Sequence, residues 1–308
     1  MLLAAGRGER MEPLSSWIPK PALEVLGHPL LASSLQLLGA SGCRTVVINL
    51  HRHPEDVAAA VRSARPPGVD PIFSWEPELL GSAGGISAAR PLLGDGPVLA
   101  ANADIYTELD LSPVLEGDED EIVLAVLPHP DPTRWSSLTL DPRGRVTAVV
   151  VPGRAGGQER FLFTGWQRVG AVVLRSLPSP PAEIGRVWDE LRRRGALRAA
   201  VVAGRWREAG TPAGYRDLVV ELLGERSWIH PAATVDPSAV LDTSAVGAAC
   251  TVGGGARLAG SVITAGASLG PGTRLERCVA AGPVRVPVGT TLADALLLPG
   301  GVYPLHAS

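Results

Sequence analysis

The last third of the chain repeats a single apolar side chain at a nearly constant spacing. The steps between these side chains are six residues long, with two steps of five, and mostly small residues stand between them. The repeated positions are Ile229, Val235, Leu241, Val246, Val252, Leu258, Ile263, Leu269 and Leu275. In a parallel β-helix each short strand points one aliphatic side chain inward, which gives a hexapeptide period. Residues 225–308 are therefore predicted to form a short parallel β-helix domain.

The first 224 residues show a different pattern, in which strand-like apolar runs alternate with helical spacing. The strand-like runs lie at residues 2–5, 45–48, 72–75 and 98–101. The helical patterns between and beside them lie at residues 30–38, 54–65 and 83–93. Such alternation is typical of a mostly parallel sheet covered on both faces. Further along, strands are expected at residues 122–127, 137–140, 145–150, 161–164 and 169–174. We therefore predict an α/β domain over residues 1–224.

Composition narrows the class of protein. The 308 residues suffice for two domains, and 45% hydrophobic with 19% charged residues is typical of soluble globular proteins. A net charge of −3 offers no broad attraction to nucleic acid, and no apolar run has the length of a membrane span. Cys43, Cys250 and Cys278 are scattered without metal-ligand spacing. The sequence predicts a cytoplasmic protein that binds neither nucleic acid nor membrane.

Lys20 is the only lysine in the chain, whose other basic residues are all arginines. An ammonium is a compact point charge on a flexible stem, whereas a guanidinium is a planar fork. A site that needs a small cation close to phosphorus can require the lysine. Because Lys20 lies between Pro19 and Pro21, shortly after a glycine-rich run, we predict that it acts at a phosphate site.

The glycine-rich run, Gly6-Arg7-Gly8-Glu9-Arg10, follows the first expected strand. Glycines allow backbone N–H groups to approach a phosphate chain, and successive N–H groups form anion-binding nests. Arg10 adds forked hydrogen bonds to phosphate oxygens. The run is not a Walker A loop, because no Gly-Lys-Ser/Thr opens a helix. Together with Pro-Lys-Pro, it predicts a site for a nucleotide.

Residues 3–30, reading LAAGRGERMEPLSSWIPKPALEVLGHPL, resemble the signature of the sugar-phosphate nucleotidyltransferases, or NDP-sugar pyrophosphorylases. The resemblance continues at residues 79–85, 102–104, 163–165, 187–191 and 206–212. These read LLGSAGG, NAD, FTG, VWDEL and WREAGTP, so that the resemblance covers essentially the whole chain. It implies a Rossmann-like, mixed-sheet catalytic domain of the GT-A type, and a left-handed sense for the β-helix.

The resemblance also implies a reaction. A sugar 1-phosphate oxygen attacks the α-phosphorus of an NTP, and an NDP-sugar and pyrophosphate are formed. Positioning and charge neutralisation supply most of the catalysis in phosphoryl transfer. The implied catalytic residues are Arg10, Lys20 and Asp104, and the implied Mg²⁺ ligands are Asp104 and Glu208.

Contacts with the two substrates are implied in the same way. The nucleotide-binding positions are Ala4, Ala5, Gly6, Gly8, Arg10, Lys20, Glu76, Gly81 and Ser82. The sugar-phosphate-binding positions are Asn102, Thr164 and Gly165.

Three departures from the family's pattern put full activity in question. Ala103 stands where the family has glycine, and Glu208 stands where it has aspartate. The second lysine of many members falls near residues 150–152, where this chain has none. Arg154 or Arg168 is a candidate to replace it.

The base is suggested by Glu76, at a position that tends to face the base edge in this family. Guanine presents two adjacent donors that one carboxylate can accept, whereas uracil and thymine suit an amide better. This favours GTP with mannose 1-phosphate, as in a mannose-1-phosphate guanylyltransferase. Uridylyl or thymidylyl transfer to another sugar 1-phosphate is the alternative.

Two readings from other classes stay open. The chain could be a non-catalytic regulatory subunit of a nucleotidyltransferase complex, which the departures from the motif favour. An acyltransferase acting through the β-helix is weakly supported, because His230 and His306 lie in no convincing acceptor pocket. The β-helix is expected to pack on the catalytic domain and to mediate a homo-oligomer.

Overall fold

The computed structural model of the chain describes residues 1–129, 131, 135–153 and 159–305. Two compact units are present, and each is built from two separate stretches of chain. The first unit contains residues 1–6 and 31–206, and the second contains residues 7–30 and 207–308. The division expected at residue 224 stays a prediction, and these units place residues 7–30 with the C-terminal part of the chain.

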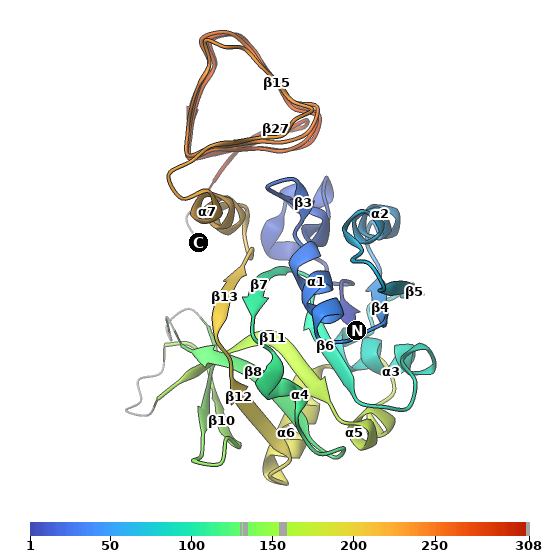
Figure 1. The fold of residues 1–308 in the computed structure, drawn as a ribbon. Helices are drawn as coiled ribbons and strands as arrows, with labels where there is room; N and C mark the ends of the chain where they lie inside the picture. Colours follow the sequence, from blue (N-terminus) through green and yellow to red (C-terminus); the bar gives the residue numbers. More distant parts are fainter. Residues whose placement is uncertain (130, 132–134, 154–158, 306–308) are drawn as a thin grey trace. The chain divides into compact units, whose positions relative to one another are not determined.

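A nine-stranded mixed sheet is the centre of the first unit (Figure 1). Its strands are β1 (Leu2–Leu3), β4 (Thr45–Leu50), β5 (Asp70–Trp75), β6 (Val98–Asn102), β8 (Ile122–Pro128), β9 (Ser137–Leu140), β10 (Val146–Val150), β11 (Phe161–Val169) and β12 (Leu197–Val201). The order is β10-β9-β11-β6-β1-β4-β5, and β8 joins β11 to β12. Strands β6, β1, β4 and β5 are parallel, and β11 is antiparallel to β6 and β8. The predicted mixed α/β sheet is therefore confirmed.

Helices bury both faces of this sheet. They are α1 (Ala32–Ala40), α2 (Pro54–Ala64), α3 (Gly81–Leu93), α4 (Ser112–Leu115), α5 (Ala171–Ser176) and α6 (Ile184–Arg193). Helix α3 packs on β4 and on α5 and α6, and its Ile86 belongs to a buried cluster with Val47 and Ala100. Strand β7 (Ile105–Leu109) pairs separately with β13 (Gly204–Glu208). Within the described residues, no helix combines the length and the apolar character that crossing a membrane requires.

Strand β11 differs from the two shorter strands expected at residues 161–164 and 169–174. It is one strand of nine residues, and the chain turns into helix α5 directly after Gly170. A register shift between Phe163 and Gln167 interrupts its pairing with β8, where Gly165 has a φ of 86°. Such a bulge leaves a residue unpaired and redirects neighbouring side chains. Residues 171–174 of the second expected strand instead belong to the helix.

Parallel coils form the C-terminal part of the second unit, and Figure 1 shows them as stacked triangles. One sheet contains β14 (Trp228–Ile229), β17 (Ala245–Val246), β20 (Val262–Ile263), β23 (Val279–Ala280), β26 (Ala295–Leu298) and β27 (Gly301–Pro304). A second contains β15 (Thr234–Val235), β18 (Thr251–Val252), β21 (Ser268–Leu269) and β24 (Arg285–Val286). The third contains β16 (Val240–Asp242), β19 (Arg257–Ala259), β22 (Arg274–Glu276) and β25 (Thr291–Ala293).

Successive coils are in register at a distance of 17 residues. Trp228 pairs with Ala245, which pairs in turn with Val262. The side chain of Ser244 repeats a contact to the next coil, because its Oγ accepts from the backbone N–H of Ser261, 17 residues on. Two steps of six and one of five therefore make one complete coil, and the predicted β-helix is confirmed.

The remaining parts of the second unit come from both ends of the sequence. Residues 7–30 form three 3₁₀ turns, η1 (Glu9–Met11), η2 (Leu14–Ser16) and η3 (Lys20–Ala22). They end in a hairpin of β2 (Glu24–Val25) and β3 (His28–Pro29). Helix α7 (Pro212–Leu223) packs on β17, β20 and β23 of the β-helix.

Candidate active site

The glycine-rich run starts at the carboxyl edge of the parallel strands. Leu3 at the end of β1 is in register with Asn49 on β4 and with Asn102 on β6. Ala4 and Ala5 are buried directly beyond this point, and Gly6 is exposed. The backbone N–H of Ala4 donates to Oδ1 of Asn49 at 2.7 Å. Because the carboxyl ends of parallel strands meet at one edge, the chain segments after β1, β4 and β6 lie side by side there.

A buried polar relay links this run to the start of α3. Nδ2 of Asn49 donates to Oε1 of Glu76 at 2.7 Å, and Oε2 of Glu76 accepts from the backbone N–H of Leu80 at 3.2 Å. Glu76 is only 1% exposed. A Cβ at Gly85 would lie 2.8 Å from Oε1 of Glu76 and 2.9 Å from Nδ2 of Asn49. The structure thus places Glu76 where it supports the backbone, with both carboxylate oxygens already hydrogen-bonded, rather than on an exposed base-reading edge.

Gly81 and Ser82 begin helix α3, against the segment that precedes α6. The hydroxyl of Ser82 donates to Oε2 of Glu183 at 2.8 Å and accepts from the backbone N–H of Ile184 at 2.9 Å. Gly81 has a φ of 74°, and a Cβ there would lie 2.8 Å from Oε1 of Glu183. The sequence analysis missed Glu183, because nothing in the sequence places residue 183 next to residue 82.

Asp104 lies in the turn that directly follows β6 and is half-buried. Ala103 before it is fully buried, and its backbone N–H donates to the carbonyl of Leu3 at 2.9 Å. The interior therefore accommodates the methyl group where the family has glycine. Gly165 lies beside the same turn, since a Cβ there would come within 3.1 Å of Nδ2 of Asn102.

Thr164 is buried in the sheet. Its hydroxyl donates to the carbonyl of Ala125 at 2.9 Å, and its own carbonyl accepts from Nε1 of Trp206 at 2.8 Å. Three residues further along β11, Oε1 of Gln167 accepts from Nε1 of Trp188 at 3.0 Å. Gln167 is another residue that the sequence analysis missed, because a lone glutamine in an apolar run carries no motif.

Charged candidates gather in the second unit. Nη2 of Arg10 lies 2.5 Å from Oε1 of Glu208, and a Cβ at Gly210 would lie 3.1 Å from Nη1 of Arg10. Gly8 has a φ of 65°, and its carbonyl accepts from the hydroxyl of Ser15 at 3.0 Å. Lys20 is 7% exposed, at the start of η3. Arg10, Lys20 and Glu208 thus belong to one compact unit, although 188 positions separate the last two in the sequence.

Of the two arginines that were candidates to replace the missing lysine, the structure describes only Arg168. Arg168 is a buried residue of β11, and it donates to Oε1 of Glu119 at 2.9 Å and to the carbonyl of Asp118 at 3.0 Å. That arrangement gives it a structural ion pair and no role at the site edge. Arg154 lies outside the described residues.

Magnesium needs few ligands from the protein, so the two implied carboxylates are of the right chemical kind for it. Among the described residues, no three His, Cys, Asp or Glu side chains gather as a metal site. Magnesium is commonly bound through one or two carboxylates, with phosphate oxygens and waters completing its octahedron. Asp104, in the first unit, and Glu208, in the second, are both half-buried carboxylates, the kind of side chain that binds magnesium.

Comparison with known proteins identifies related sequences. The nucleotidyl transferase family matches residues 1–150. N-acetylmuramate alpha-1-phosphate uridylyltransferase of Neisseria meningitidis is 45% identical over 116 residues, which cover 36% of this chain and 49% of that protein. Mannose-1-phosphate guanylyltransferase catalytic subunit beta of Drosophila melanogaster is 25% identical over 69% of this chain and 59% of its own length. The chain spans about half the length of these curated relatives.

A solved structure shares the fold. HddC from Yersinia pseudotuberculosis aligns with a TM-score of 0.62 at 23% identity, over 72% of this chain and 97% of its own. At that identity the likeness concerns the fold alone. The family match over residues 1–150 and the named relatives confirm the resemblance of the chain to the sugar-phosphate nucleotidyltransferases.

Proposed function

We propose that the protein joins a nucleoside triphosphate to a sugar 1-phosphate and releases an NDP-sugar and pyrophosphate. The observation that carries the proposal is the carboxyl edge of the sheet, where Ala4 and Ala5 follow a strand flanked by Asn49 and Asn102. Ligands of open α/β sheets bind at this edge, and Asp104 lies in the turn after β6.

The charged groups receive the following roles. Lys20 and Arg10 neutralise charge on the triphosphate, and Asp104 and Glu208 hold Mg²⁺. When bound, the metal neutralises charge on phosphate oxygens and orients them. In the structure Arg10 and Glu208 form an ion pair with each other. Substrate binding would exchange this pair for an arginine–phosphate contact and a carboxylate–metal contact, so that neither charge is left unpaired.

Backbone groups position the substrates in this proposal. The N–H groups after β1, from Ala4 to Gly8, approach the phosphates, and Gly81 and Ser82 border the base and ribose. Asn102 and Gly165, which lie together, contact the sugar phosphate. Thr164 acts through its fixed backbone, because its hydroxyl is held by Ala125. Glu76 acts as a positioning residue that fixes the entry to α3.

Two bases remain candidates. Guanylyl transfer to mannose 1-phosphate is the expectation from Glu76, and the Drosophila guanylyltransferase subunit is similar over 69% of the chain. Uridylyl transfer is the second candidate, since the Neisseria uridylyltransferase is 45% identical over 116 residues. The engagement of both Glu76 oxygens favours this second candidate, because the guanine argument needs a free carboxylate.

The decisive experiment measures pyrophosphate release from GTP, UTP, dTTP, CTP and ATP with magnesium and a panel of sugar 1-phosphates. The panel includes mannose 1-phosphate and N-acetylmuramate 1-phosphate. We expect Lys20→Ala and Asp104→Asn to lower kcat/KM by about 100-fold or more, because each removes charge that stabilises the transition state. Lys20→Arg tests whether a compact ammonium is needed. Asp95→Asn, at an exposed aspartate, is the matched control.

A folded protein that binds nucleotide but releases no pyrophosphate with any pair would contradict the enzyme and support a regulatory subunit instead. Size-exclusion chromatography with light scattering tests the homo-oligomer that we propose for the β-helix. Fractionation of the source cells tests the proposed cytoplasmic location.

A further inference from the structure

The segment that carries Lys20 is fastened to helix α7 by a buried hydrogen bond. The hydroxyl of Tyr215 donates to the backbone carbonyl of Glu24, four residues after Lys20. Tyr215 is fully buried, and burial together with the Glu24 carboxylate raises the pKa of its phenol above the ordinary value. The raised pKa favours the protonated phenol, whose hydroxyl donates to the Glu24 carbonyl.

The side chain of Glu24 fastens the same segment to the β-helix. Its carboxylate accepts from the backbone N–H of Ala265, and a Cβ at Gly247 would lie 2.7 Å from its Oε2. Its Oε1 is buried with no hydrogen-bond partner in the part of the chain that the structure describes. Glu24 is half-buried as a residue, and a buried carboxylate oxygen without a hydrogen-bond partner lowers stability.

The hairpin that follows Glu24 packs on the first coil. A Cβ at Gly27, which has a φ of 86°, would lie 3.0 Å from the ring of Trp228. Trp228 in turn packs edge-to-face against His230, with ring centroids 5.7 Å apart. Contacts from α7 and from the first three coils thus converge on residues 24–27.

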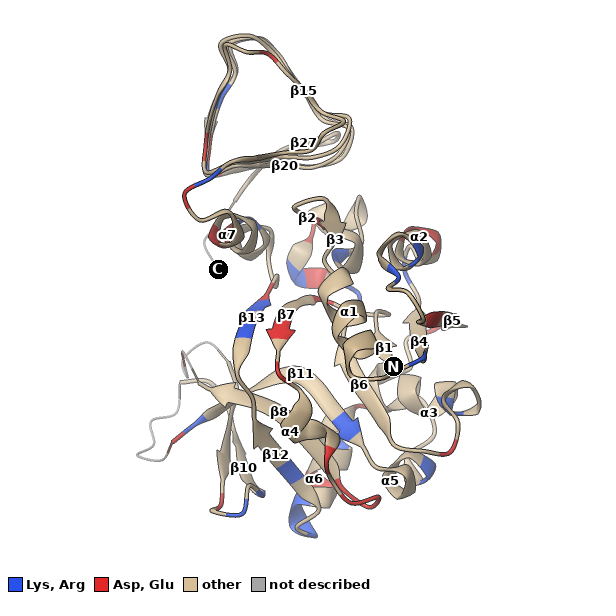
Figure 2. Ribbon diagram, in the orientation of Figure 1, with Lys and Arg blue, Asp and Glu red and all other residues tan. Residues whose placement is uncertain are grey.

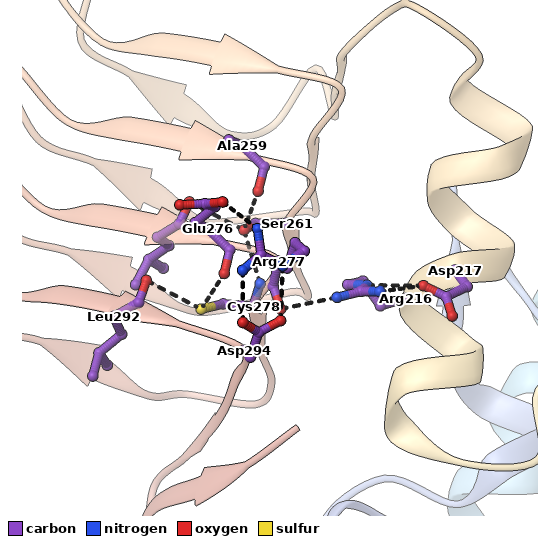
Figure 3. A network of polar contacts seen from close by, with 10 residues as sticks. Arg216, Asp217, Ala259, Ser261, Glu276, Arg277, Cys278, Leu292 and Asp294 are labelled. Atoms are coloured by element: carbon purple, nitrogen blue, oxygen red, sulfur yellow. Dashed lines mark hydrogen bonds and ion pairs between the residues drawn. The ribbon is translucent and has the colours of Figure 1, made fainter. Parts of the chain in front are cut away.

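Helix α7 is itself tied to the coils. Figure 3 shows Arg216 reaching from α7 to the carbonyl of Arg277, which it meets at 3.2 Å. Arg277 is held by Asp294 of the next coil, with Nε at 2.8 Å from Oδ1. The same helix begins at Pro212, a few residues after Glu208, and Thr211 caps it by accepting from the N–H of Gly214 at 3.0 Å.

We infer that the β-helix and α7 form a strut that positions the Lys20 segment, with Tyr215 and Glu24 as its positioning residues. Each end of the strut leads to a charged group of the proposed site: Glu24 to Lys20, and the start of α7 to Glu208. The β-helix then contributes to phosphate chemistry from a distance, without touching substrate. The catalytic consequence of this inference rests on the proposed function, whereas its structural part does not.

The test compares Tyr215→Phe and Glu24→Ala with wild type. Phenylalanine keeps the packing and removes only the hydroxyl. We expect hydrogen–deuterium exchange over residues 11–30 to rise at least threefold in both variants, and kcat/KM for the nucleotide to fall roughly fivefold, as for loss of one buried hydrogen bond. A smaller folded fraction would lower kcat alone, whereas displacement of Lys20 raises KM for the nucleotide as well.

Two further variants complete the design. Glu24→Gln keeps an acceptor for Ala265 and should restore near wild-type exchange and kinetics. Tyr106→Phe removes the hydroxyl of a half-buried tyrosine, which donates to Glu108 at 2.6 Å in the first unit, and should leave exchange over residues 11–30 unchanged. The strut is refuted if exchange in Tyr215→Phe equals that of Tyr106→Phe. Absence of turnover in wild type would overturn the proposed function, while the exchange comparison would still decide on the strut.

Discussion

The carboxylates of Glu76, which is buried, and of Glu24, which is half-buried, differ in how fully they are hydrogen-bonded. Both oxygens of Glu76 accept hydrogen bonds, whereas Oε1 of Glu24 has no partner among the described residues. Burial raises the pKa of Glu24 above the ordinary value of 4.5, against the opposing effects of His230, the Ala265 N–H and His28. A satisfied buried carboxylate rigidifies its surroundings, whereas an incompletely satisfied one destabilises the fold in its charged form.

Glu24→Gln should therefore stabilise the protein in a pH-dependent way. Because the pKa is raised on folding, the folded state holds this proton more tightly, and the contribution of Glu24 to stability falls as pH rises above 4.5 through the raised value. Glutamine does not titrate. We expect a melting temperature about 2 °C above wild type at pH 8, and a gap that narrows towards pH 5. Differential scanning calorimetry across this range measures it; a gap that widens on acidification would contradict the assignment.

Whether the role of a single residue could be predicted from the sequence depended on where its hydrogen-bond partners lie in the sequence. Lys20, Asp104 and Gly81 were identified because their motifs are local. The engagement of Glu76 with Asn49, and of Arg168 with Glu119, could not be foreseen, because each pair joins positions that are distant in the sequence. A carboxylate at a motif position and a buried structural carboxylate look identical until their hydrogen-bond partners are known.

At the scale of elements, Gly85 allows α3 to pack close to the ends of β4 and β5, because glycine has no side chain that would meet Asn49 and Glu76. Gly85→Ala would place a methyl group within 2.9 Å of both Asn49 and Glu76, whose hydrogen bonds leave little freedom to move. Overpacking of this kind costs about 1–3 kcal/mol, which corresponds to a drop of at least 2 °C in melting temperature.

Gly185→Ala is the matched control for that substitution. Gly185 is also in a helix, α6, and a Cβ there meets nothing within 4 Å. Since alanine favours helix over glycine, this variant should be neutral or slightly stabilising. Equal melting temperatures for the two variants would show that α3 can move away from β4.

Elements whose apolar residues recur at a regular spacing could be predicted from the sequence. Elements whose secondary structure depends on tertiary neighbours could not. The spacing of Val246, Val252 and Leu258 sufficed for the β-helix, because each coil repeats the same inward position. Ile229 obeys the same spacing but is 45% exposed, since it lies in the first coil, which has a neighbouring coil on only one side. Helix α5 was mistaken for a strand because a short apolar run fits either structure.

At the scale of the whole molecule, neither compact unit is a continuous stretch of sequence. Acidic and basic residues are interspersed along both units in the view of Figure 2. Truncation after Gly224 keeps every motif residue but removes Ala265, Gly247 and Trp228, on which the Glu24 hairpin packs.

We expect the truncated chain 1–224 to lose protection of residues 7–30 and to lower kcat/KM by at least tenfold. The physical reason is that the hairpin and the coil-facing side of α7 lose their packing partners. Hydrogen–deuterium exchange and pyrophosphate release measure both effects. Full activity in the fragment would show that residues 1–224 are an independent catalytic domain.

The discontinuous second unit also affects how the chain emerges from a ribosome. Residues 7–30 are made early, yet their packing partners begin at residue 207. At a synthesis rate of about 5–20 residues per second, that separation corresponds to a wait of roughly ten to forty seconds. During that interval the large sheet can form, while the stretch bearing the sole lysine stays without its support. Lys20 and the hairpin after it therefore stay without the packing of Tyr215, Gly247 and Ala265 until those residues have been translated.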